Sequence, residues 1–477
     1  MGITDNQIEK ILLEMGMGTS AAHVTAGPSM DTGIGSTLRS NGVYETVDQA
    51  IKAVSACQAG FFRLPIKVRC EVIEEMRREA KANAKHLAQL AHEETGYGSV
   101  EHKTAKNMLA AEKTPGVEDL HTRAFSGDDG LTLVECAPYG VIGAITPSTN
   151  PTSTVINNSI GMVAGANGVV FNPHPGAKKS SNEAVRILNR AIDKVCGIPS
   201  LLGTLDTPSS KTGKQLMEHE NIRMLAITGG EAVVNLALRS GKKVIAAGPG
   251  NPPVIVDDTA DIDQAAKDIT RGASFDNNVL CIAEKEVFVM RSVVKQLIEK
   301  MQAAGCYLAQ GDEIEAITRT VVSKTDHGNA ANKDFVGRSA KHILTESGIN
   351  VSSNPPLVIC RCAADHPLVM TEMLMPVLPI VAVDNLEEAI DKAVAAENGC
   401  FHTAIMHSKN VDHLTIAARR LDTTIFVKNA PSFAGLGFEG EGYTSLTIAT
   451  PTGEGLTSAR SFVRARRCTL AGSFHIL

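Results

Sequence analysis

The sequence has no tryptophan, and aromatic residues make up only 4% of its 477 residues. Because proteins that bind single-stranded nucleic acid stack bases on aromatic side chains, this shortage argues against such a role. The formal net charge of −6 likewise gives no sign of a basic, nucleic-acid-binding surface. No apolar run approaches about 18 residues, and the first residues lack the apolar core of a signal peptide. We therefore expect a cytoplasmic protein without a membrane span.

The ten cysteines are scattered along the chain, and no Cys-x-x-Cys pair occurs. No Cys/His spacing resembles a zinc site, so we expect no metal. Scattered thiols in a long chain fit a reducing cytosol rather than a disulfide scaffold. The contents of 43% hydrophobic and 21% charged residues are ordinary for a globular protein, and the length predicts two large domains.

The N-terminal 40 residues form a segment of their own. Four apolar residues from Ile8 to Met15 recur at the spacing of one helical face. A Gly-, Ser- and Thr-rich stretch follows, which is typical of a flexible linker. Because so short a helix is marginal alone, we expect residues 1–18 to dock, either on the protein's own body or on a partner, with 19–40 as the linker.

Strand-like and helix-like segments alternate after a strongly helical region at 46–114. The first set of expected strands is 141–145, 168–172, 222–228 and 243–246, and the second set is 254–256, 286–290, 357–360 and 378–383. Such alternation predicts parallel, Rossmann-like sheets, whose ligands bind at the carboxyl ends of the strands. The Arg-rich segment 458–468 is expected to be an exposed or intermolecular strand.

The first strands end in polar loops rich in Gly or Pro. Gly229 and Gly230, at the start of a helix, can offer backbone N–H groups to a phosphate, although glycines at such turns are often only turn residues. The one Gly-x-Gly-x-x-Gly match, Gly435 to Gly440, does not lie between a strand and a helix, and we interpret it as a loop.

A small polar loop, Ser274-Phe275-Asp276-Asn277-Asn278, leads into Cys281 and then into the strand expected at 286–290. A thiol presented in this way is placed to act as a nucleophile. A free cysteine is also among the most often buried residue types, so Cys281 taken alone fits a core position equally well.

Several motifs occur in the order found in the aldehyde dehydrogenase superfamily, which the chain resembles from about residue 40 onward. They are Glu94-Thr95-Gly96, the Pro147-x-x-Asn150-Pro151 loop, Thr228-Gly229-Gly230-Glu231, the Cys281 loop, and Glu372-Met373-Leu374-Met375-Pro376, in which Met375 replaces the family's glycine. The resemblance implies an α/β fold with two Rossmann-like α/β domains and an oligomerisation β-arm.

Four further stretches resemble the CoA-acylating aldehyde dehydrogenases of bacterial microcompartments, of the ethanolamine- and propanediol-utilisation type. These stretches are Pro147 to Thr154, Asn172 to Ser180, Gly248 to Pro253 and Thr450 to Gly455. The resemblance implies that the N-terminal helix docks on a microcompartment shell protein, and that the protein resides inside such a compartment.

The resemblance also implies domain boundaries. We expect a docking helix at 1–18, a linker at 19–40, a nucleotide-binding domain at 41–247 with part of the arm near 115–138, a catalytic domain at 248–437 and a C-terminal return and arm at 438–477.

By resemblance, Cys281 adds to an aldehyde, and the Asn150 amide and the Cys281 backbone N–H stabilise the oxyanion. Loss of hydride to NAD then leaves an acyl thioester on Cys281. Glu372 is expected to contact the nicotinamide ribose. The residues expected to bind the cofactor are Thr146, Pro147, Ser148, Asn172, His174, Pro175, Thr228, Gly229, Gly230, Gly248 and Glu372. His174 and His402 can be proposed as bases, but we favour an ordinary loop position for each.

Two departures from the family bear on the expected subclass and on the choice of cofactor. Hydrolytic members activate water with a glutamate, and Ala246 falls at that position. The CoA thiol ionises more readily than water, so we expect thiolysis to acyl-CoA. Asn172 stands where the family has a lysine that holds the adenosine ribose, which leaves NAD against NADP open.

Other functions stay open at this point. A hydrolytic or an acyl-phosphate-reducing aldehyde dehydrogenase has the same fold. An interaction protein docked by residues 1–18, with its catalysis lost, is a third possibility, which the presence of both Cys281 and Asn150 disfavours. Propionaldehyde and acetaldehyde, either direction of reaction, and a dimer or a tetramer all fit the sequence.

Overall fold

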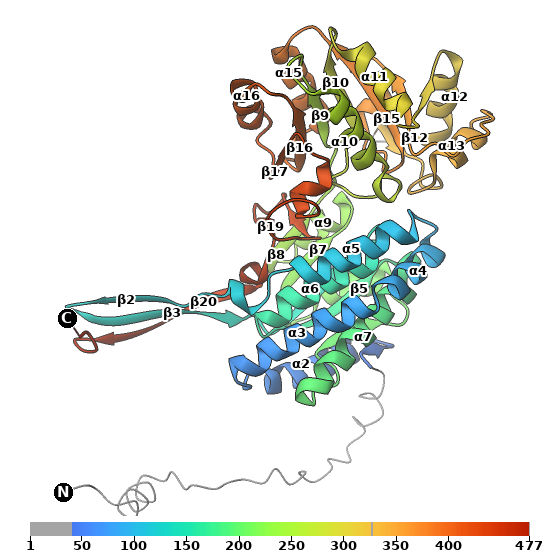
Figure 1. Ribbon diagram of the computed structural model, residues 1–477. Helices are drawn as coiled ribbons and strands as arrows, with labels where there is room; N and C mark the ends of the chain where they lie inside the picture. The colour runs from blue at the N-terminus through green and yellow to red at the C-terminus, as the bar shows by residue number, and fades with distance from the viewer. Residues whose placement is uncertain (1–40, 326–327, 477) are drawn as a thin grey trace, which may run out of the picture. The chain divides into compact units, whose positions relative to one another are not determined.

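The computed structural model describes residues 41–325 and 328–476 (Figure 1). The predicted docking helix at 1–18 and linker at 19–40 lie outside these residues. No helix in the described ranges has the length and apolar character that crossing a membrane requires.

The first sheet has six parallel strands in the order β1-β6-β5-β4-β7-β8 within the described residues. They are β1 (Val43–Tyr44), β4 (Val141–Thr146), β5 (Gly168–Pro173), β6 (Leu202–Leu205), β7 (Ile222–Thr228) and β8 (Lys243–Ala247). Every residue of β5 is buried, and β4 is buried at all but one position. Near-continuous apolar runs of this kind suit parallel strands that helices cover on both faces.

Eight helices surround this sheet in the described part of the chain. They are α2 (Val47–Phe61), α3 (Ile66–Ala82), α4 (Ala84–Thr95), α5 (Val100–Lys113), α6 (Pro151–Ala164), α7 (Lys178–Cys196), α8 (Ser210–Glu218) and α9 (Glu231–Leu238). The side chains of α3, α6 and α7 share one hydrophobic core, and those of α2, α8 and α9 share a core on the other face of the sheet. The region predicted to be helical thus contributes to both faces of the first sheet, with α2 on one face and α3 on the other.

The second sheet has seven parallel strands in the order β11-β14-β15-β10-β9-β16-β17 within the described residues. The strands are β9 (Pro253–Val256), β10 (Glu286–Met290), β11 (Tyr307–Ala309), β14 (Val358–Arg361), β15 (Val377–Val383), β16 (Thr403–His407) and β17 (Ile425–Lys428). The helices around it are α10 (Ile262–Ser274), α11 (Val294–Ala303), α12 (Asp312–Val321), α13 (Ala340–Glu346), α14 (Pro367–Met370), α15 (Leu386–Glu397) and α16 (Val411–Leu421). The two predicted parallel sheets are confirmed.

The sequence patterns did not predict several of the strands. They include β6, β11, β16 and β17, each of three to five residues. In β6 the apolar pattern is interrupted by Gly203, where an added Cβ would lie 2.9 Å from a Val54 side-chain carbon. That glycine is present because α2 packs closely on the sheet, a reason that the local sequence does not display.

A three-stranded antiparallel ribbon of β2 (Arg123–Gly127), β3 (Gly130–Pro138) and β20 (Val463–Ala471) extends away from the sheets (Figure 1). The Arg-rich strand predicted at 458–468 starts later, because a 3-10 turn at Ala459–Phe462 precedes it. Most side chains of β2 and β20 are exposed. Short antiparallel pairs, β12 (Val322–Thr325) with β13 (Gly328–Ala331) and β18 (Ile448–Ala449) with β19 (Gly455–Leu456), complete the described strands.

Candidate active site

A cleft of about 760 Å³ opens at the carboxyl ends of β4, β5, β7 and β8. Volumes of this order hold cofactors and other extended ligands. All thirteen residues proposed from the sequence line it: Thr146, Pro147, Ser148, Asn150, Asn172, His174, Pro175, Thr228, Gly229, Gly230, Gly248, Cys281 and Glu372. Residues that lie more than 200 positions apart in the chain thus face one space.

The loop before Cys281 has an unusual backbone. Asp276, Asn277 and Asn278 have φ values of 50°, 52° and 66° in succession, in the left-handed region. Asn and Asp tolerate this region better than other residues with a side chain, which explains the Asn-rich sequence. The loop therefore requires anchors that hold three successive residues in place.

Asp276 supplies the first anchor. Its buried carboxylate accepts the Ser99 backbone N–H at 2.9 Å and the Lys103 ammonium at 3.1 Å, and it also pairs with Lys106. Burial alone would raise the pKa of Asp276, but Lys106 and Lys103 hold it below its ordinary value. The carboxylate stays ionised and ties the loop to α5, since Ser99 is the N-cap of that helix.

Asn278 and Lys285 supply the second anchor. The Asn278 amide donates to the Ala273 carbonyl at 2.8 Å and to the Glu284 carbonyl at 3.0 Å. The buried Lys285 ammonium donates to the Asn278 side-chain oxygen at 2.6 Å and to the Leu280 carbonyl at 2.9 Å. The backbone on both sides of Cys281 is thereby held by buried hydrogen bonds.

The Cys281 thiol is half-buried, and burial, followed by the Glu372 carboxylate, raises its pKa to about 12. Lys285 and the backbone N–H groups of Cys281 and Ile282 oppose this shift. Glu372 accepts the Gly250 N–H at 3.3 Å, and burial raises its own pKa while Lys285 lowers it. Near neutral pH the thiol of the free protein is therefore mostly protonated.

We expect Glu372→Gln to speed the alkylation of Cys281 by iodoacetamide severalfold at pH 8. The Glu372 carboxylate raises the thiol pKa, so its removal lowers that pKa and increases the thiolate fraction at a fixed pH. In the unchanged protein the rate should rise steadily from pH 7 to 10, because that range lies below the thiol pKa. Glu372→Asp, which keeps the charge, is the matched control. A slower reaction in the Gln variant would contradict this electrostatic assignment.

Asn150 occupies the N-cap position of α6, yet its side chain makes no capping hydrogen bond. Its Oδ1 instead accepts the Lys106 ammonium at 2.5 Å, and its Nδ2 donates to the Thr149 hydroxyl at 3.3 Å. Because an ammonium group only donates, the amide oxygen must face Lys106 and the NH₂ group must face away. The contact of Lys106 with Oδ1 therefore orients the Asn150 amide and leaves its N–H groups on the opposite side.

Asn172 lines the end of the cleft near α8. Its Oδ1 accepts the Thr212 hydroxyl at 2.6 Å, and its Nδ2 lies 3.4 Å from the Ser209 carbonyl. Both amide groups thus hold the start of α8. Gly229 and Gly230 precede α9, and an added Cβ on Gly230 would meet no atom within 4 Å, so the approach to this backbone is open. The turn fits a phosphate group, which backbone N–H groups at a helix start bind well.

Two histidines lie in different surroundings. His174 is exposed and its Nδ1 accepts the Gly176 N–H at 3.1 Å, which makes it a local turn residue. His402 is fully buried and absent from the cleft lining, and its Nδ1 lies 2.9 Å from the Thr403 hydroxyl. Burial, and then Lys285, lower the pKa of His402 to about 4, so its ring is neutral at pH 7. We assign neither ring a catalytic role.

Ala246 lies within β8 and is fully buried. Its N–H donates to the Thr452 hydroxyl at 3.1 Å, while the next two residues, Ala247 and Gly248, line the cleft. Among the described residues that line the cleft, Glu372 is the sole carboxylate.

Glu94 has a structural role at the start of α7. Its carboxylate accepts the Lys179 and Ser180 backbone N–H groups, each at 2.8 Å, and so caps the start of α7. An anion at a helix N-terminus is favourable because it meets unpaired N–H groups and the helix dipole.

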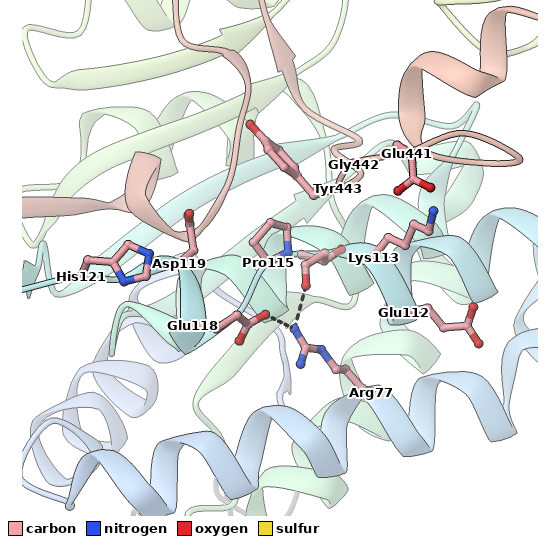
Figure 2. Close-up of a pocket in the computed structure, with 11 residues that line it drawn as sticks. Arg77, Glu112, Lys113, Pro115, Glu118, Asp119, His121, Glu441, Gly442 and Tyr443 are labelled. Atoms are coloured by element: carbon pink, nitrogen blue, oxygen red, sulfur yellow. Dashed lines mark hydrogen bonds and ion pairs between the residues drawn. The ribbon is translucent and has the colours of Figure 1, made fainter.

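A second, open pocket of about 490 Å³ shares no lining residue with the cleft (Figure 2). Arg77 donates to the Glu118 carboxylate at 2.7 Å and to the Thr114 carbonyl at 2.9 Å. Lys113 donates to the backbone carbonyls of Gly437 and Gly440. Because these cations are paired within the protein, we assign no ligand to this pocket.

The sequence reading missed the groups beneath the cleft. Lys103 and Lys106 lie on α5, and neither they nor Lys285 belong to the site residues that the sequence predicts. Two buried lysines on one helix are unusual, because lysine is rarely buried unless paired. That signal appears only once burial is known.

Comparison with known proteins assigns the chain to a family. Residues 25–443 match the model described as the aldehyde dehydrogenase family, and the chain belongs to that family. This confirms the family predicted from the motifs.

The relatives extend the likeness to CoA-acylating members. A propanal dehydrogenase (CoA-propanoylating) of Salmonella typhimurium is 47% identical over 436 residues, which cover 91% of this chain and 93% of that protein. A propionaldehyde dehydrogenase from the Clostridium phytofermentans fucose utilisation bacterial microcompartment has a TM-score of 0.89 at 46% identity, covering 91% of this chain and all of that one (100%). The Rhodopseudomonas palustris propionaldehyde dehydrogenase, solved with bound CoA and an acylated cysteine, has a TM-score of 0.87 at 45% identity, with coverage of 91% and 98%.

Proposed function

We propose that this protein is a CoA-acylating aldehyde dehydrogenase that converts propionaldehyde or acetaldehyde, with CoA and NAD, to the acyl-CoA. The observation that carries the proposal is the placement of the Cys281 thiol and the oriented Asn150 amide on one nucleotide-sized cleft. The acylated cysteine and bound CoA of the Rhodopseudomonas palustris relative support it.

The first half-reaction is addition. The Cys281 sulfur attacks the aldehyde carbonyl as a thiolate and forms a thiohemiacetal, since a free aldehyde is a poor hydride donor. The Asn150 Nδ2 and the Cys281 backbone N–H donate to the developing oxyanion. Loss of hydride then leaves an acyl thioester on Cys281, and bound NAD supplies the hydride acceptor.

The second half-reaction is transfer of the acyl group to the CoA thiol. Water attacks a thioester slowly without a base, and Ala246 provides none at the position of the family's glutamate. Glu372, which lines the cleft, is held by the Gly250 N–H. A hydrolytic reaction that used Glu372 as its base is the alternative on the same fold.

We propose that NAD and CoA bind the cleft in turn. The open Gly229-Gly230 turn suits a pyrophosphate, and both molecules carry an ADP group. We therefore propose that the reduced cofactor leaves before CoA enters. Asn172 stands in place of the family's ribose-binding lysine, and its amide oxygen is engaged by Thr212 of α8. NAD and NADP are therefore to be compared directly.

The decisive experiment is NADH formation from propionaldehyde and NAD, with and without CoA. Sustained turnover should require CoA, and propionyl-CoA should accumulate in step with NADH. Sustained turnover without CoA would mean that water deacylates Cys281, and the proposed subclass would be wrong. Phosphate in place of CoA tests the acyl-phosphate alternative.

We also propose that residues 1–18 dock on a microcompartment shell protein, and that the ribbon of β2, β3 and β20 joins protomers into a dimer or a tetramer. The origin of the Clostridium phytofermentans relative in a microcompartment and the exposed ribbon support these proposals. Equal recovery of the full chain and of a chain lacking residues 1–18 with shell proteins would refute the docking.

A further inference from the structure

A buried cluster of charged side chains lies beneath the cleft and consists of Lys103, Lys106 and Asp276. The side chains of Lys103 and Lys106 are 3% and 5% exposed, and that of Asp276 is fully buried. Two ammonium groups therefore share one carboxylate. Burying charge is costly, so an excess cation at this place needs an explanation beyond holding the loop.

Lys106 differs from Lys103 in its second contact. Its ammonium group donates to the Asn150 Oδ1 at 2.5 Å as well as to Asp276. The Lys103 ammonium donates to Asp276 and lies 3.4 Å from the Thr149 backbone carbonyl, without touching the Asn150 side chain. The two lysines thus share the structural task, and only Lys106 reaches the amide.

The contact with Lys106 takes the place of the capping hydrogen bond that an N-cap asparagine usually makes. Such a residue ordinarily turns its side-chain oxygen back to the first N–H groups of the helix, and Asn150 does not do so. With the oxygen held by a cation, the NH₂ group faces the opposite way. Thr149 accepts one N–H, and the described part of the chain shows no acceptor for the other. A cation on the amide oxygen also polarises the amide and strengthens its N–H groups as donors.

We propose that Lys106 is a positioning residue for the oxyanion donor: it orients and polarises the Asn150 amide, while Asp276 couples this amide to the loop that carries Cys281. The inference rests on the proposed function, because it assigns Lys106 an effect on the oxyanion formed during addition to the aldehyde. Lys106 does not touch the substrate in this scheme and acts through Asn150.

The test is a double-mutant cycle on single-turnover NADH formation from propionaldehyde at saturating NAD. We expect Lys106→Met to slow this step roughly 10- to 100-fold, somewhat less than the effect of removing an oxyanion donor outright. The double variant with Asn150→Ala should be no slower than Asn150→Ala alone, within about twofold, because no amide is left to orient. Additive losses would overturn the proposal.

Lys103→Met is the matched control. Each Met variant leaves one lysine opposite Asp276, so neither creates an unpaired buried carboxylate. Lys103→Met should keep the single-turnover rate within about threefold, and an equal loss in both variants would show a merely structural role. If Lys106→Met does not fold, as judged by thermal unfolding, Lys106→Gln provides the second variant with the same expected non-additivity.

Alkylation of Cys281 by iodoacetamide separates the oxyanion from the thiol, because alkylation forms no oxyanion. The rate in Lys106→Met should stay within about twofold of the unchanged protein, and a parallel loss would place the effect on Cys281 and overturn the proposal. If Asn150→Ala is slow and Lys106→Met is not, this inference alone fails. If Asn150→Ala retains the full rate, the oxyanion role of Asn150 fails with it.

Discussion

Replacement of Cys281 by alanine is expected to abolish CoA-dependent NADH formation, with a loss of roughly 10⁴-fold or more. Without the sulfur no thiohemiacetal forms, and the aldehyde retains a hydrogen that is difficult to remove as hydride. The measurement is the steady-state rate with propionaldehyde, CoA and NAD, accompanied by intact-mass analysis after incubation with propionyl-CoA. The variant should acquire no acyl group.

Cys70→Ala provides the control, because Cys70 is an exposed thiol on α3. Its rate should match that of the unchanged protein. Retention of CoA-dependent turnover in Cys281→Ala would show that another group carries the acyl intermediate, and the mechanism proposed above would have to be abandoned.

Replacement of Asn150 by alanine is expected to reduce kcat by roughly 10²- to 10³-fold, the usual effect of removing one oxyanion donor. The amide N–H bonds the oxygen more strongly in the thiohemiacetal than in the free aldehyde, so its loss should appear mainly in kcat. The second donor, the Cys281 backbone N–H, remains and accounts for the residual rate.

Iodoacetamide alkylation of Cys281 tests whether Asn150→Ala spares the thiol itself. We expect the alkylation rate to be nearly unchanged, since the Asn150 side chain bonds Lys106 and Thr149 rather than Cys281, and alkylation involves no oxyanion. Equal losses in alkylation and in turnover would instead indicate a displaced Cys281 loop. A kcat close to that of the unchanged protein would remove Asn150 from the oxyanion site.

Local sequence located the buried strands well. The strand at 286–290 has the predicted bounds, and the strand expected at 141–145 runs to Thr146. Parallel strands covered on both faces must be apolar throughout, and loops with Gly, Pro or Asn interrupt these runs sharply. The shorter edge strands β11 and β17 carry too few residues to stand out from the helices beside them.

The sequence by itself determined the family, the two parallel sheets, and thirteen of the residues that line the cleft, including Cys281 and Asn150. These follow from patterns within short segments: apolar runs, turn residues, and motifs that occur in a fixed order. Only the tertiary structure decided how the Cys281 thiol and the Asn150 amide are held. Lys106 contacts Asn150 across 44 residues and Asp276 across 170, and in sequence it is one lysine among several on a helix. The positioning role of Lys106 follows from the burial of its ammonium group and from its two hydrogen-bond partners. The burial and the contacts arise only when α5 packs beneath the Cys281 loop.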